Sequence, residues 1–208
     1  MINYSGKIDP RENTIVENLP VGAYVGRVID ATIETVDTSS GSFDRLVLKL
    51  DVAEGEHRDH YAKQFASQNG GAYAARWKGI IRYNIPQVGG QYEQGQKKAL
   101  EHLAWCLQDS NPKYKWDGDE AKIKGLKIGF SVRERDWLME RDGQINFGTT
   151  TEIGRVESVN KVLAGEVKPM KKRELRDADK EKLAQYESTH KQTETSGMVA
   201  VNDDDLPF

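Results

Sequence analysis

Hydrophobic and polar residues alternate along several stretches of the chain, which predicts a protein built mainly from β-strands. Residues 23–36 are rich in β-branched and aromatic residues, and residues 45–52 place an apolar side chain at every second position. Turn-forming residues 37–42 lie between these stretches, so we expect the two strands to form a hairpin. The length of the first strand favours a bulge near Gly26 or Asp30, where the buried face changes.

Three further extended stretches follow along the chain. Residues 78–85 predict a third strand, which is ended by Pro86, and residues 121–133 predict a fourth. Asp142-Gly143 is typical of a hairpin turn. Residues 144–162 then supply a fifth extended region.

One main helix is expected between the third and the fourth strand. Residues 94–109 carry Leu100, Leu103, Ala104 and Leu107 on one stripe. Residues 54–68 fit either a loop or a short helix. Five extended segments with a helix in this place match the element order of an OB-fold, a small five-stranded Greek-key barrel.

The composition changes beyond residue 169. The basic run 171–173 opens a polar stretch that supports at most a short, weakly amphipathic helix as far as residue 188, and residues 189–202 predict a disordered linker. We therefore expect a folded, OB-fold-like domain over residues 1–169 and a flexible tail over residues 170–208.

The last six residues form a motif of their own, Asp203-Asp204-Asp205-Leu206-Pro207-Phe208. The motif is too short to bury anything itself, so it is best interpreted as a peptide that another protein binds. Phe208 offers a ring and a carboxylate, Pro207 limits the entropy lost on docking, and the aspartates suit a basic rim. An ordinary solvated acidic tail is the alternative interpretation.

The charge of the chain is unevenly distributed. The net charge is −3, from 30 Lys and Arg against 33 Asp and Glu, yet residues 192–208 hold acidic residues and no Lys or Arg. The remaining body is therefore close to neutral. Such a body can still bind nucleic acid if its cations gather on one face.

Cysteine usage and hydropathy indicate the compartment. Cys106 is the only cysteine, which excludes an intramolecular disulfide and a cysteine-based zinc site and fits a reducing cytoplasm. No apolar run reaches membrane-spanning length, and the first residues lack a signal-peptide pattern. We expect a cytoplasmic protein with no membrane partner.

The cluster His57-Arg58-Asp59-His60 is the strongest candidate for catalytic chemistry. The two histidines are three residues apart with no helical pattern around them, so a solvated loop is the favoured interpretation. A metal-dependent nuclease that uses His57, Asp59 and His60 is the alternative. No phosphate-binding glycine motif is present, and no catalytic triad can be identified by spacing. We expect no enzyme activity, no bound metal and no cofactor.

Interleaved aromatic and basic residues make a stronger case for binding. Proteins that bind single strands stack rings on bases and place cations along the phosphates. The candidate DNA-binding residues are Tyr73, Arg76, Trp77, Lys78 and Arg82 around the third strand, Lys115 and Trp116 before the fourth, and Arg133, Arg135 and Trp137 after it.

Each of these residues has an alternative role in core packing or on a solvated face. On the third strand, alternation favours Ile81, Tyr83 and Ile85 on one face and Ile80, Arg82 and Asn84 on the other. Arg82 is therefore expected to face a ligand while Tyr83 packs in the core. Trp77, between Arg76 and Lys78, is the preferred stacking residue.

The six-residue tip closely resembles the acidic C-terminal tip of bacterial single-stranded DNA-binding proteins. The body is more similar to single-stranded DNA-binding proteins encoded by phages or mobile elements of Gram-positive hosts. That similarity is carried by Gly22-Ala23-Tyr24, Trp77-Lys78-Gly79, Asn111-Pro112 and Lys124-Gly125-Leu126-Lys127-Ile128-Gly129.

The resemblance implies an OB-fold that coats single-stranded DNA during replication or recombination in a bacterial host. It also implies that the tip recruits replication, recombination or repair proteins. The number of subunits stays open, and a homo-oligomer is compatible with the resemblance. The main alternative is an adaptor that uses the tip without binding DNA itself, and charge reversal at Arg76, Lys78 and Arg82 would separate the two.

Overall fold

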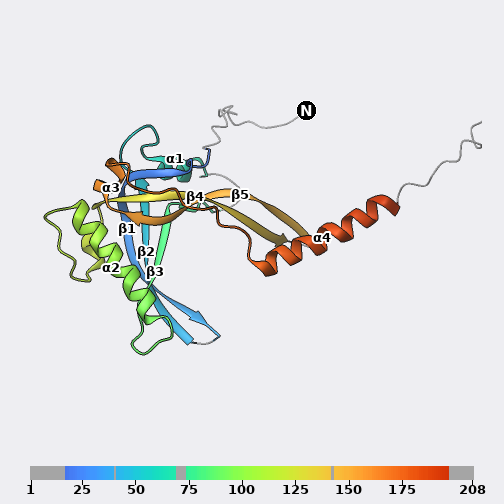
Figure 1. Cartoon of the computed structure of the whole chain (residues 1–208), viewed down its shortest axis with the longest axis horizontal. Helices are drawn as coiled ribbons and strands as arrows, with labels where there is room; N and C mark the ends of the chain where they lie inside the picture. The colour runs from blue at the N-terminus through green and yellow to red at the C-terminus, as the bar shows by residue number, and fades with distance from the viewer. Residues whose placement is uncertain (1–16, 40, 69–73, 142, 197–208) are drawn as a thin grey trace, which may run out of the picture. The chain divides into compact units, whose positions relative to one another are not determined.

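The computed structural model describes residues 17–39, 41–68, 74–141 and 143–196. Five strands in this part of the chain form one sheet with the order β3-β2-β1-β4-β5 (Figure 1). Their bounds are Gly22–Thr38 for β1, Gly41–Val52 for β2, Ile80–Asn84 for β3, Lys127–Arg141 for β4 and Gln144–Glu157 for β5. The central strand β1 pairs antiparallel with both β2 and β4.

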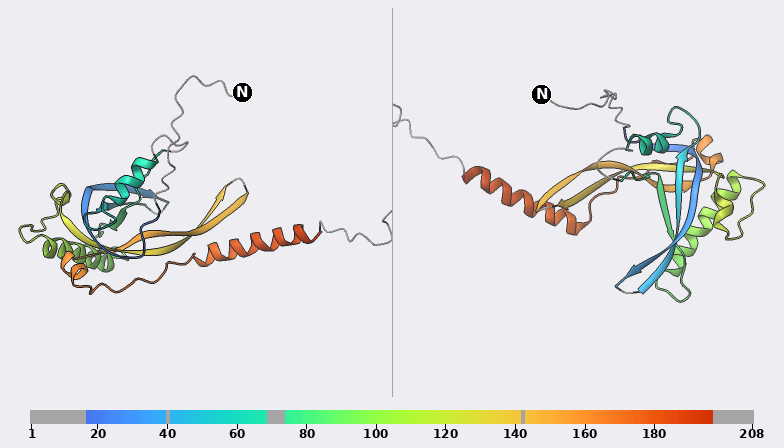
Figure 2. Two further views of the ribbon diagram at one scale, coloured as in Figure 1. Left: turned by 90° about the horizontal axis from the view of Figure 1, so that it is seen from above. Right: turned by 180° about the vertical axis from the view of Figure 1, so that it is seen from behind.

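The helices that the structure describes complete the fold. They are α1 (His60–Ser67), α2 (Glu93–Ser110), the 3-10 helix η1 (Glu120–Ile123), α3 (Val159–Leu163) and α4 (Asp177–Ser196). Helix α2 follows β3 and precedes β4 in the chain. In space it packs beside β3 and α3 (Figure 2). None of the described helices combines the length and the apolar character that a membrane crossing requires.

The strand order confirms the predicted mainly-β, OB-fold-like architecture. Strands β1, β2 and β3 are consecutive neighbours, and β4 returns to lie beside β1. This arrangement of four antiparallel strands is the Greek key. Within the described residues, β3 and β5 are the two edges of the sheet.

The chain divides into two compact units. The first, called here the sheet unit, is Met1–Arg133 with Thr151–Lys171, and the second, the hairpin unit, is Glu134–Thr150 with Lys172–Phe208. The sequence placed a boundary between residues 169 and 170, close to the end of the sheet unit. The outer part of the β4–β5 hairpin, however, groups with the residues that follow Lys171.

The core of the sheet unit confirms the alternation read from the sequence. Leu46, Leu48, Leu50 and Val52 of β2 are buried together with Ile128, Phe130 and Val132 of β4. The predicted bulge is present, because the pairing of β1 with β2 shifts between Val28 and Asp30. Val28 and Ala31 both reach the core although they are three residues apart, since the bulge changes the alternation between them.

The predicted helix over residues 94–109 is confirmed as α2. Its buried positions are Leu103, Cys106 and Leu107. Cys106 is fully buried, as expected for a small apolar residue, and burial raises the pKa of its thiol to about 12. The thiol is therefore protonated at neutral pH.

The predicted ends of the last two strands are wrong. Strand β4 begins at Lys127 instead of residue 121, because Asp119 accepts a hydrogen bond from the Ala121 N–H at 3.0 Å and starts η1. Strand β5 ends at Glu157, after which the Ser158 hydroxyl accepts from the Lys161 N–H at 3.2 Å and caps α3.

The C-terminal segment is more helical than predicted. Helix α4 runs from Asp177 to Ser196, whereas the sequence predicted at most a short helix as far as residue 188. The helix carries few large apolar residues besides Leu183 and Tyr186, which is why no long apolar stripe in the sequence indicated its length. The Asp203–Phe208 tip lies outside the described residues.

Candidate nucleic-acid interface

The edge strand β3 separates core residues from surface residues as predicted. Ile81 and Tyr83 pack against the core, whereas Arg82 and Asn84 are exposed. Burial raises the pKa of Tyr83, so its hydroxyl stays neutral. Arg82 therefore lies on the opposite, outer side of the strand.

The cations of β1 and β2 on this outer side are already paired. Lys49 lies 3.2 Å from Asp30, and Arg45 forms an ion pair with Glu34. Such partly exposed pairs leave little net positive charge for a ligand. The outer sides of β1 and β2 are therefore close to neutral.

Lys78 and Arg82 differ from these paired cations. Both are exposed, and within the described residues neither has an ion-pair partner. The carbonyl of Gly79 accepts from the Leu50 N–H at 2.7 Å, so the pairing of β2 with the β3 segment continues next to Lys78. Lys78 itself precedes β3, and its carbonyl accepts from the Ile80 N–H at 2.8 Å, so a tight turn separates the exposed Lys78 from Arg82 in the strand.

Trp77, the preferred stacking residue, is held by the fold. Its indole N–H donates to the Leu50 carbonyl at 3.1 Å, and its ring packs against the core and lies 5.9 Å from the Phe65 ring. The residue is half-buried. These contacts correspond to the packing alternative for Trp77.

Gly79 explains why the Trp77-Lys78-Gly79 segment can pack so closely on β2. A Cβ atom at Gly79 would lie 2.3 Å from the Leu50 carbonyl oxygen and 2.4 Å from the ring of Tyr61. Only glycine fits at this position without a backbone shift. The segment is therefore a structural junction between β2, α1 and β3.

The neighbouring candidates differ in how well the structure places them. Arg76 is exposed and has no ion-pair partner in the described residues, while its backbone N–H donates to the Gln68 side chain at 3.0 Å. Tyr73 lies outside the described residues. Lys115 is exposed, but Trp116 is half-buried and packs against the core.

Arg133 is neutralised by a partner on the next strand. Its Nε and Nη2 atoms both donate to Glu152 Oε1, at 3.0 Å and 2.9 Å, and both side chains are mostly buried. The sequence contained the signal for this pair, because equal counting outward from a hairpin turn predicted at Asp142-Gly143 pairs Arg133 with Glu152. Arg133 is a structural cation in this position.

Arg135 and Trp137 lie in the hairpin unit, on the outer part of β4. Trp137 is half-buried, and its ring covers Gly148: a Cβ atom there would lie 3.2 Å from Trp137 Cζ2. Arg135 forms a parallel β-bridge with Arg173, a residue that the sequence assigned to the tail. The basic run 171–173 was the available sign that this segment has a role beyond a linker.

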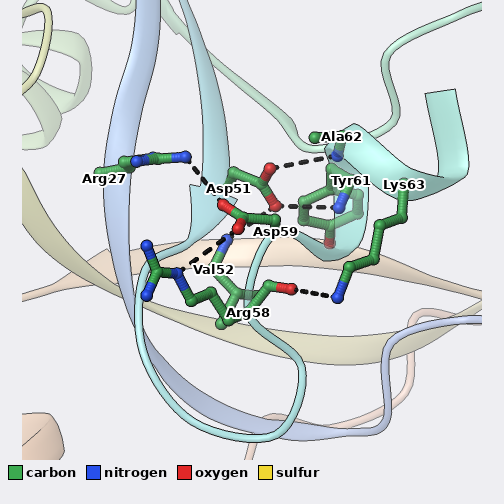
Figure 3. A network of polar contacts seen from close by, with 8 residues as sticks. All are labelled: Arg27, Asp51, Val52, Arg58, Asp59, Tyr61, Ala62 and Lys63. Atoms are coloured by element: carbon green, nitrogen blue, oxygen red, sulfur yellow. Dashed lines mark hydrogen bonds and ion pairs between the residues drawn. The ribbon is translucent and has the colours of Figure 1, made fainter. Parts of the chain in front are cut away.

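The predicted solvated loop at His57–His60 is wrong for its last residue, because His60 is buried and begins α1. Burial, followed by the charge of His57, lowers the pKa of His60. Asp59 is held by Arg27 at 2.8 Å (Figure 3). Across the described ranges, no group of three His, Cys, Asp or Glu residues could hold a metal ion.

The same close-up shows a residue that sequence reasoning misplaced. Asp51, expected on the polar side of β2, is fully buried. Its carboxylate accepts from the N–H groups of Val52 and Tyr61 at 2.9 Å and from that of Ala62 at 3.1 Å (Figure 3). Asp51 therefore caps the N-terminus of α1 from a neighbouring strand.

Two surfaces with cations result, each within its own unit: the cations of the first are exposed, and that of the second is half-buried. The sheet unit carries Lys78 and Arg82 at its β3 edge, and the hairpin unit carries Arg135 beside Trp137. No protein-family model matches the chain, and no curated protein matches it either.

Proposed function

We propose that this protein is a non-sequence-specific single-stranded DNA-binding protein that acts in replication or recombination in the cytoplasm of a bacterial or phage-infected cell. The observation that carries the proposal is where the candidate residues lie on the fold. Arg82 lies on the outer side of β3 with the exposed Lys78 just before the strand, and Arg135 and Trp137 lie on the β4–β5 hairpin. The face of the second and third strands and the loop between the fourth and fifth are the parts of OB-folds that bind oligonucleotides.

The physical basis of binding would be charge combined with stacking. Each phosphate that a cation neutralises releases counterions, so affinity falls as the salt concentration rises. Each base stacked on an aromatic ring contributes roughly 1–3 kcal/mol. Neither interaction reads the base sequence, which is why the protein would coat single strands irrespective of sequence.

The acidic tip supports the second half of the proposal. Asp203, Asp204, Asp205, Leu206, Pro207 and Phe208 would recruit replication, recombination or repair proteins that offer an apolar pocket with a basic rim. A tip of this chemistry also explains the negative net charge, because its acidic residues belong to the partner-binding motif and not to the DNA-binding surface.

The test is a titration of oligo(dT) at low salt, followed by tryptophan fluorescence. We expect tight, salt-sensitive binding with quenching. The double variant Lys78→Glu/Arg82→Glu should lower the affinity at least about tenfold, because two phosphate contacts become repulsive. The control variant Lys98→Glu/Lys124→Glu replaces two exposed lysines elsewhere and makes the same change in net charge. It should bind oligo(dT) with the affinity of the wild type.

Two results would count against the proposal. If the wild-type protein neither binds oligo(dT) nor shows quenching at low salt, the protein is not a single-strand binder, and the adaptor interpretation replaces it. If the two double variants lose affinity equally, the effect comes from net charge and the β3 edge is not the binding surface.

A further inference from the structure

The segment after Lys171 forms part of the hairpin unit's own sheet edge. The Arg173 N–H donates to the Glu134 carbonyl at 2.9 Å, and the Arg173 carbonyl accepts from the Asp136 N–H at 2.9 Å. These bonds make the parallel bridge between Arg135 and Arg173. Strand β4 pairs with β1 only as far as Val132, so its residues 134–136 have Arg173 as their neighbour instead.

Side-chain contacts hold this segment in place. Lys172 lies 2.7 Å from the Asp136 carboxylate, which also accepts from the Thr149 hydroxyl at 2.6 Å. The hydrogen bond from Lys172, followed by that from Thr149, lowers the pKa of Asp136. Further along, Lys180 of α4 pairs with Glu174 at 2.7 Å. The segment is therefore anchored at both ends.

A pocket with a cavity volume of about 220 Å³ lies between this segment and β4. Its basic and aromatic lining comes from Arg135 and Trp137 of the hairpin and from Arg173 and Arg176 of the segment. Of its acidic residues, Asp136 and Glu174 already have lysine partners, which leaves Asp179 as the remaining carboxylate. The lining itself holds three arginines and three carboxylates, and the lysine partners Lys172 and Lys180 add two positive charges beside it.

The Trp137 ring is fixed at this pocket. A Cβ atom added to Gly148 would lie 3.2 Å from Cζ2 and 3.4 Å from Nε1 of the indole. The ring therefore lies directly over the backbone of this glycine. A ring held in one position loses little entropy when a base stacks on it. The arginines suit phosphate because their planar guanidinium groups can donate two parallel hydrogen bonds.

We propose that the segment 172–176 completes a nucleotide-binding pocket on the β4–β5 hairpin, in which a base stacks on Trp137 and Arg173 and Arg176 bind the adjacent phosphates. The inference rests on the proposed single-strand binding and adds a site to it. It assigns a DNA-binding role to residues that follow the sheet unit in the chain.

The experiment uses the full chain and a fluorescently labelled oligo(dT), with anisotropy measured over a range of salt concentrations. The variant Arg173→Gln/Arg176→Gln removes two charges while keeping the backbone bridge. Lys97→Gln/Lys98→Gln on α2 makes the same change in net charge and is the matched control. Trp137→Ala removes the ring without changing the charge.

For the arginine variant we expect the affinity at low salt to fall about tenfold. The slope of log affinity against log salt should become shallower by about 1.4, since each phosphate contact on a single strand contributes roughly 0.7. Trp137→Ala should also lose about tenfold but keep the wild-type slope, because stacking is not ionic. The lysine control should change neither quantity.

Failure of this inference and failure of the proposed function give different results. If the arginine variant keeps wild-type affinity and slope while Lys78→Glu/Arg82→Glu weakens binding, the pocket is not a nucleotide site. If the wild type does not bind oligo(dT), both proposals fall. Arg173→Lys/Arg176→Lys checks for a folding effect: it should keep the wild-type slope, and a loss as large as that of the glutamine variant would overturn the proposal.

Discussion

At the scale of single residues, Asp51 shows how one buried carboxylate connects two elements. It belongs to β2, yet two of its three hydrogen bonds reach Tyr61 and Ala62 at the start of α1. Hydrogen bonds to a charged acceptor are about twice as strong as neutral ones, and an anion at a helix N-terminus is further stabilised by the helix dipole. Asp51 therefore fixes where α1 begins and how it meets the sheet.

Replacing Asp51 by Asn tests this connection. An amide group has only one acceptor oxygen, so at least one buried N–H would lose its partner. We expect the free energy of unfolding, measured by urea denaturation, to fall by about 2 kcal/mol. Asp37→Asn, at an exposed position of β1, should change it by no more than about 0.5 kcal/mol. Equal values for the two variants would show that the cap contributes nothing.

Residue roles were predictable from the sequence where they depend on local alternation. Arg82 and Tyr83 were assigned to the correct sides of β3, exposed and core, because adjacent residues of a strand face opposite ways. Asp51 and Arg133 could not be assigned from their neighbours alone, because their partners lie ten and nineteen residues away in the chain.

At the scale of elements, the junction before β3 depends on a glycine. The Leu50 backbone donates to the Gly79 carbonyl and accepts from the Trp77 indole, so this segment extends the edge of β2 beyond the strand itself. Tyr61 of α1 closes the junction from the other side. Three elements therefore meet where there is no room for a side chain.

Gly79→Ala should disrupt this junction. The added methyl group would meet a carbonyl oxygen and a buried ring, and we expect a loss of about 2–3 kcal/mol in the free energy of unfolding. Gly95→Ala is the matched control, because it lies in α2 with no atom within 4 Å of the added Cβ. It should stabilise the protein by about 0.5–1 kcal/mol, since alanine favours helix. Thermal and urea denaturation would measure both, and a loss at Gly95 as large as at Gly79 would contradict the clash.

Elements with strong local patterns were predicted, and those set by caps were not. Strands β1, β2 and β3 and helix α2 follow from periodicity. The elements η1 and α3 depend on single capping side chains, Asp119 and Ser158, within short segments that also contain β-forming residues. Helix α4 has no apolar stripe to reveal its length.

At the scale of the whole molecule, the tip and the body are expected to affect DNA binding in opposite ways. The tip contributes three of the 33 acidic residues, as many as the excess of acidic over basic residues in the chain. Aspartates that can reach a DNA-binding surface compete with phosphates for the same cations.

Removal of residues 203–208 should therefore preserve or strengthen oligo(dT) binding and abolish the capture of partner proteins. Affinity would be measured at two salt concentrations for the full chain and the shortened one. Capture from a bacterial lysate, with the proteins identified by mass spectrometry, would use a chain with the same six residues in scrambled order as the control. Weaker DNA binding after removal, or replication and recombination proteins captured equally by the scrambled chain, would contradict the proposed role of the tip.

The bridge between Arg173 and β4 also determines how this protein can be dissected. A fragment that ends at residue 169, where the composition changes, would lack Arg173. The Glu134 carbonyl and the Asp136 N–H would then lose the hydrogen bonds that they form with the Arg173 backbone. Unpaired strand edges are templates for self-association. Such a fragment would be prone to aggregate, and a loss of DNA binding in it would be mistaken for evidence about the tail. Dissection should instead cut beyond α4, after Ser196.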